Sequence, residues 1–81
     1  DYLKRLDDIE NIALSFDGIT ESYAIQAGRE VRVMVDYDKI TDQNIDLVSA
    51  QIARKIEDEL DYPGQVKITL HREFRATDYA K

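Results

Sequence analysis

The sequence has no cysteine and no tryptophan, and its 81 residues include one histidine, one proline and three glycines. Without cysteine, neither a disulfide framework nor a thiolate metal site can form. The single histidine, His71, excludes the paired-histidine centres of zinc and di-metal enzymes. Three widely separated glycines exclude a glycine-rich phosphate loop and the G-x-x-G loop of KH domains. The sequence therefore predicts no catalytic residue, no metal ligand set and no cofactor in this chain.

Long apolar runs are also absent. No stretch approaches the roughly 18 apolar residues of a membrane span, and the first residues lack the basic-then-apolar pattern of a signal peptide. We therefore expect no direct membrane contact by this chain. The chain begins at Asp1, without an initiating methionine, and its first residues already have the spacing of a helix. This predicts that it is a piece of a longer protein.

The charge of the chain is acidic but unevenly distributed. Eleven basic and 17 acidic residues give a net charge of −6, which on average opposes the binding of RNA, DNA or anionic lipid. Residues 1–22 and 41–63 each sum to −4, residues 23–40 sum to 0, and residues 64–81 sum to +2. Any contact with phosphate would therefore use residues 23–40 and 64–81.

The spacing of apolar residues predicts one helix and two strands in the first half of the chain. Between residues 2 and 16, apolar residues recur every three or four positions, which is typical of an amphipathic helix that ends at Gly18. From Ser22 the period changes to two. Strands on either side of Gly28, which supplies a positive φ, then predict a hairpin.

The second half of the chain predicts another helix, a third strand and a polar tail. Thr41 or Asp42 is expected as the N-cap of a helix whose apolar stripe runs from Ile45 to Leu60. The sequence Tyr62-Pro63-Gly64 should end that helix, because proline cannot continue it and glycine tolerates a left-handed turn. Alternation then predicts a strand over residues 66–71, followed by a tail from Phe74 with aromatic residues at Phe74 and Tyr79.

These elements predict a single α+β domain over residues 1–81, with the order α-β-β-α-β. A right-handed crossover makes the last strand parallel to the second, which gives a small three-stranded mixed sheet with both helices on one face. The residues expected under the helices are Tyr23, Ile25, Val31, Val33, Val35, Val66, Ile68 and Leu70. The uncovered face, where a partner is expected, would show Ala24, Gln26, Arg32, Met34, Lys67, Thr69 and His71.

Two long phrases in the sequence are more specific than its composition. One runs from Ser22 to Val33 (SYAIQAGREVRV), and the other runs from Tyr62 to Thr69 (YPGQVKIT) and on to Tyr79-Ala80-Lys81. In order and over essentially the whole chain, they resemble the C-terminal end of the ribonuclease Y family. Phe74 departs from the family pattern, in which a small polar residue is expected between Glu73 and Arg75.

The resemblance implies that the chain is a C-terminal accessory domain of a longer bacterial endoribonuclease of mRNA decay. The parent would have an N-terminal membrane anchor, a coiled coil, a KH domain and an HD-type domain that holds divalent metal. That anchor would place the chain at the cytoplasmic side of the membrane. None of the metal ligands falls in this sequence, so no catalytic residue is carried over.

Three hypotheses follow for the chain itself. In the first, it mediates homodimerisation or docking of RNA-degradation partner proteins through Ala24, Gln26, Met34, Thr69 and His71. In the second, it positions single-stranded RNA, with weak phosphate contacts from Arg29, Arg32, Lys67, Arg72 and Arg75. In the third, which draws only on the type of fold, it is a regulatory domain that binds a small molecule.

Overall fold

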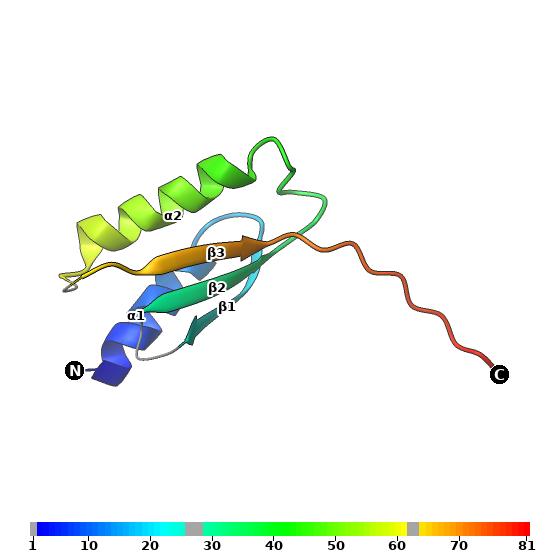
Figure 1. Cartoon of the computed structure of the whole chain (residues 1–81), viewed down its shortest axis with the longest axis horizontal. Helices are drawn as coiled ribbons and strands as arrows, with labels where there is room; N and C mark the ends of the chain where they lie inside the picture. The colour runs from blue at the N-terminus through cyan, green and yellow to red at the C-terminus, as the bar shows by residue number, and fades with distance from the viewer. Residues whose placement is uncertain (1, 26–28, 62–63) are drawn as a thin grey trace.

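The computed structural model describes residues 2–25, 29–61 and 64–81, and it confirms the predicted α+β fold class and element order. These residues form two helices and a three-stranded mixed sheet, whose arrangement can be followed in Figure 1. The elements are α1 (Tyr2–Leu14), β1 (Ile19–Ile25), β2 (Glu30–Val35), α2 (Ile45–Glu59) and β3 (Lys67–His71).

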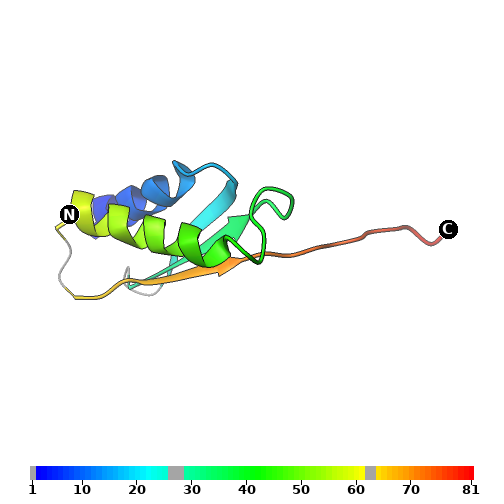
Figure 2. The same cartoon turned by 90° about the horizontal axis from the view of Figure 1, so that it is seen from above.

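The sheet has the order β1-β2-β3, so β2 is central and the other two strands form the edges. β1 is antiparallel to β2, and β3 is parallel to β2, as the crossover through α2 requires. Figure 2 shows both helices on the same side of the sheet. The predicted mixed topology, with the helices on one face, is therefore confirmed.

The hydrophobic core lies between the sheet and the two helices. Its buried members are Ile9, Ile12, Ala13, Val31, Val33, Val35, Ile40, Ile52 and Ile56. Val66, Ile68 and Leu70 pack against this core and are partly buried. Ile40, which precedes α2, was not predicted in the core. Its Cδ1 lies 2.7 Å from the point where a Cβ on Gly18 would stand, and Gly18 has a φ of +88°. This close approach explains a glycine at position 18.

One prediction was wrong: β1 presents the opposite face to the helices. Tyr23 lies opposite Arg32, and Ala24 lies opposite Val31. Residues opposite each other in an antiparallel pair share a face, so Tyr23 and Ile25 point away from the helices while Ala24 points towards them. The pairing register shifts between Ile19 and Glu21, and the extra residue reverses the alternation that follows.

The start of α2 also differs from the prediction. The N-cap is Asn44 rather than Thr41 or Asp42, and the Asn44 Oδ1 accepts a hydrogen bond of 2.7 Å from the Thr41 N–H. Residues 41–44 form a turn before the helix, with the Ile45 N–H donating to the Thr41 carbonyl at 2.9 Å. Gly64 has a φ of +91°, as predicted for a left-handed turn after α2. The predictions for Gln26, Gly28, Tyr62 and Pro63 lie outside the described residues.

Candidate functional site

The side of the sheet opposite the helices, here called the open face, carries alternate residues from all three strands. Strand register places on it Glu21, Tyr23, Ile25, Glu30, Arg32, Met34, Lys67, Thr69 and His71. No described element covers this face. Met34, Thr69 and His71, which the sequence assigned to an interface, share it, and they form adjacent rows with Glu21 and Arg32. Ala24 is excluded from it by the reversal of β1.

Two polar pairs organise the middle of the open face. The Tyr23 hydroxyl donates a hydrogen bond to Glu21, and the Arg32 Nε donates to the Glu30 Oε2 at 3.2 Å. The bond to Glu21 raises the pKa of Tyr23 above its ordinary value, with smaller contributions from desolvation and from the negative charge of Glu21. Tyr23 is still 48% exposed, so its ring remains available to a partner. Tyrosine, methionine and arginine are enriched in protein interfaces, and this face presents all three.

The five basic residues predicted to contact phosphate do not form one patch. Arg32 and Lys67 lie on the open face, Arg29 precedes β2, and Arg72 and Arg75 follow β3. Three of them are already paired. Arg32 contacts Glu30, Arg72 contacts Asp42 at 3.0 Å, and Arg75 contacts Glu73 at 2.6 Å. Among the described residues, Arg29 and Lys67 have no ion-pair partner.

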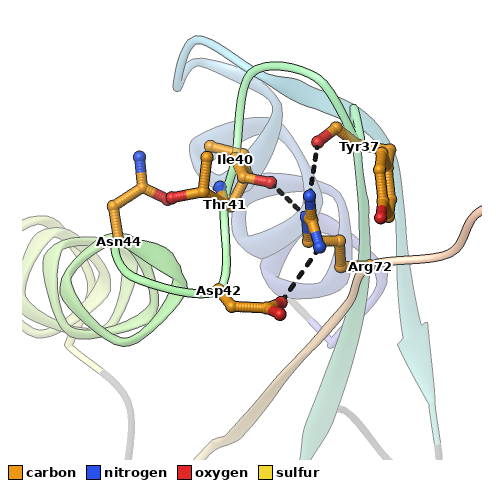
Figure 3. A network of polar contacts seen from close by, with 6 residues as sticks. All are labelled: Tyr37, Ile40, Thr41, Asp42, Asn44 and Arg72. Atoms are coloured by element: carbon orange, nitrogen blue, oxygen red, sulfur yellow. Dashed lines mark hydrogen bonds and ion pairs between the residues drawn. The ribbon is translucent and has the colours of Figure 1, made fainter.

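Arg72 anchors the start of the tail to the loop between β2 and α2 (Figure 3). Its Nε donates to the Ile40 carbonyl at 2.6 Å, its Nη2 to the Tyr37 carbonyl at 3.1 Å, and its Nη1 to Asp42. The guanidinium carbon also lies 3.6 Å from the centroid of the Tyr37 ring, a cation–π contact. The Arg72 side chain is 17% exposed, so most of its surface is buried against the rest of the domain.

This network was missed by sequence reasoning. Its partners lie 30 to 35 residues before Arg72, and no local motif connects them. The network extends to the tail, because the rings of Tyr37 and Phe74 are 5.3 Å apart. Phe74 nevertheless remains 73% exposed and Tyr79 is 82% exposed. Beyond Arg72, the tail extends away from the rest of the domain (Figure 1).

A groove of about 900 Å³ lies between the second half of α2 and the start of β3. Its apolar lining comes from Ala53, Ile56 and Leu60 on the helix and from Val66 and Ile68 on the strand side. Arg29, Lys67, Glu57 and Asp61 also line it, so it has charges of both signs.

The described residues contain no group of three or more histidine, cysteine or acidic side chains placed to hold a metal ion. Within the same residues, no helix combines the length and the apolar character needed to cross a membrane.

Comparison with known proteins gives the chain a context. No protein-family profile matches it. It is 54% identical over 80 residues to ribonuclease Y of Fusobacterium nucleatum, 58% to that of Geotalea uraniireducens and 55% to that of Streptococcus pyogenes. Each alignment covers 99% of this chain but only 15% or 16% of the relative. Over almost its whole length, the chain is therefore similar to a segment that makes up about 15% of ribonuclease Y.

Proposed function

We propose that this chain is a non-catalytic C-terminal module of ribonuclease Y, an endoribonuclease that initiates mRNA decay. Its role is to hold that enzyme to a second copy or to RNA-degradation partner proteins through the open face. The observation that carries the proposal is that face itself, which presents Tyr23, Ile25 and Met34 with no described element over them.

The rest of the proposal concerns the parent protein. Its divalent metal and catalytic residues belong to an HD domain outside this chain, and its membrane anchor lies N-terminal to it. A small domain with a solvated sheet face has an exposed surface suited to protein contact but little enclosed volume suited to catalysis.

Deletion of residues 1–81 from the parent, followed by assays of RNA cleavage and of oligomeric state, tests the role directly. Loss of assembly or of partner binding with cleavage retained supports the proposal. Loss of cleavage in an intact assembly contradicts it and indicates substrate positioning.

A pair of point variants tests the surface. Met34→Glu places a charge on the open face, whereas Leu47→Glu places the same charge on α2, where the leucine is 60% exposed. We expect Met34→Glu to weaken partner retention in pull-downs at least tenfold and Leu47→Glu to leave it unchanged. Equal retention by both variants would remove the open face from the proposal.

RNA positioning is the second candidate function, and one observation favours it. Arg29 and Lys67 have no ion-pair partner among the described residues, and the Lys67 N–H donates to the Arg29 carbonyl at 2.8 Å, so their backbones are adjacent. A salt titration of single-stranded RNA binding tests this candidate, because phosphate contacts lose affinity steeply with salt. The double variant Arg29→Ala/Lys67→Ala should flatten that dependence, whereas Lys39→Ala, which removes a lysine paired with Asp17, should not. Absence of binding at low salt would exclude this function.

A further inference from the structure

The two edges of the sheet differ in their protection. At the β1 edge, the Ala24 N–H donates to the Glu10 carboxylate of α1 at 2.7 Å. The register shift near Thr20 also disrupts the regular backbone of this edge. Side chains and bulges that occupy or distort an edge prevent another strand from pairing with it. The β1 edge is therefore poorly suited to strand addition.

Among the described residues, the β3 edge shows neither a side-chain contact of this kind nor a register shift. Because the Lys67 N–H donates to the Arg29 carbonyl, and backbone N–H groups along a strand alternate in direction, those of Ile68 and Leu70 point away from β2. No described side chain donates to or accepts from these outward groups.

The tail lengthens this edge. Residues 72–81 continue from β3 as an extended segment that projects from the domain (Figure 1). Within the described part of the chain, this segment contacts the domain through Arg72 and Phe74. If the tail keeps the backbone alternation of β3, the N–H and C=O groups of the even-numbered residues from Ile68 to Ala80 face the same side. An extended row of unpaired backbone groups is a template for another strand.

We propose that a second copy of this chain pairs with this edge, antiparallel and about a two-fold axis at Phe74. The tail of each copy then adds to β3 of the other, with Leu70 opposite Asp78 and Ile68 opposite Ala80 of the second copy. The inference rests on the self-association part of the proposed function, but it assigns the contact to an edge rather than to the open face.

Charge and shape select this register. A two-fold antiparallel pairing that uses the outward backbone groups must pair even-numbered residues with even-numbered residues. Among such registers, only the one centred on Phe74 places Glu73 opposite Arg75 of the second copy, and it does so twice. In one chain these residues already bind each other at 2.6 and 3.1 Å across the extended tail, so the dimer would hold an alternating quartet of charges. It would also bring two exposed Phe74 rings together.

A mixing experiment tests the pairing. A homodimer of the Glu73→Arg chain or of the Arg75→Glu chain would bring four like charges together at its two-fold axis. Each variant alone should therefore be monomeric in sedimentation velocity at concentrations where the unmodified chain is dimeric. An equimolar mixture should form a heterodimer, because each chain then opposes the other with the complementary charge. Failure of the mixture to associate while the unmodified chain dimerises would overturn this register.

Proline variants test the edge independently. Ala76→Pro removes an N–H that faces the second copy and should raise the dissociation constant about tenfold or more, since the loss occurs twice per dimer. Thr77→Pro is the matched control, because its N–H points away from the second copy and the dimer should persist. Far-UV circular dichroism of each variant verifies that the domain is folded.

The outcomes separate this inference from the proposed function. If the dimer survives Ala76→Pro but is lost in Met34→Glu, the edge contact is wrong and the open-face function stands. If the unmodified chain is a monomer up to millimolar concentration, the edge contact is wrong, and partner retention by the parent still decides the proposed function. Loss in Ala76→Pro with persistence in Thr77→Pro and Met34→Glu supports the edge contact.

Discussion

On the side of the sheet that the helices cover, Val31, Val33 and Val35 of β2 are buried, whereas on the other side of the same strand Arg32 is exposed and Met34 is half-buried. The covered side is fixed by packing with Ile9 and Ile52, which are fully buried. The open side is held by short-range polar pairs, each of which stabilises an exposed surface only slightly. One strand thus contributes half of its side chains to the core and leaves the other half on the open face.

The largest test of this contrast is truncation of neighbours on β2. Val33→Ala should lower the free energy of unfolding by about 2–3 kcal/mol, because it removes fully buried methyl groups and leaves a cavity. Met34→Ala on the open face should cost less than about 1 kcal/mol. Urea denaturation of both variants measures the difference. Equal losses would mean that the open face belongs to the core.

Gly18 provides the next test, because it lies where α1 turns towards the sheet. Its φ of +88° and the close approach of Ile40 both disfavour a side chain. Gly18→Ala should therefore destabilise the fold by roughly 1–3 kcal/mol. Gly64→Ala has a similar φ, of +91°, but its nearest contact is the end of the flexible Arg29 side chain, so its loss should be the smaller of the two in the same urea experiment. The reverse order would show that crowding by Ile40 is unimportant.

Variants of the Arg72 network test how the tail is attached to the rest of the domain. Arg72→Ala should cost about 1–3 kcal/mol, because it leaves two main-chain carbonyls without their charged donor. Arg75→Ala, which removes only a pair with the exposed Glu73, should cost less than about 1 kcal/mol. Thermal unfolding of the two variants provides the measurement. A loss for Arg75→Ala as large as that for Arg72→Ala would contradict the assignment of Arg72 as the anchor.

The regular spacing of apolar residues made part of this structure predictable from the sequence. Val31, Val33, Val35 and the α2 stripe alternate or repeat without interruption, so the element order and most of the core followed from spacing. The face assignment of β1 failed because alternation from Ser22 onward does not show which of the two faces is covered, and the bulkier residues Tyr23 and Ile25 lie on the open one. The Arg72 contacts failed for another reason: they join residues distant in sequence, and only the folded chain brings them together.

The burial of the Ser22 side chain follows directly from the reversed face of β1. It lies opposite Val33 on the covered side, and its Oγ is buried without a hydrogen-bond partner among the described residues. Ser22→Ala removes this unsatisfied group with little change in volume, so it should stabilise the domain by about 1 kcal/mol. Ser49→Ala removes a hydroxyl that donates to the Asp46 carbonyl at 2.8 Å and should give no gain in the same urea experiment. A destabilising Ser22→Ala would contradict the presence of an unsatisfied buried hydroxyl at position 22.

Titration of Tyr23 gives the smallest effect and examines the open face alone. Its pKa is raised chiefly because the neutral hydroxyl donates to the Glu21 carboxylate, a bond that the phenolate cannot make. Any stabilisation from this bond is present below the ordinary pKa of 10.0 and is lost as the pH rises through the raised value. In a spectrophotometric titration, Glu21→Gln should move the pKa of Tyr23 back towards 10.0, whereas Glu73→Gln should leave it in place. If Glu21→Gln has no effect, the pairing of Glu21 with Tyr23 does not persist in solution, and the tyrosine ring is free to reorient towards a partner.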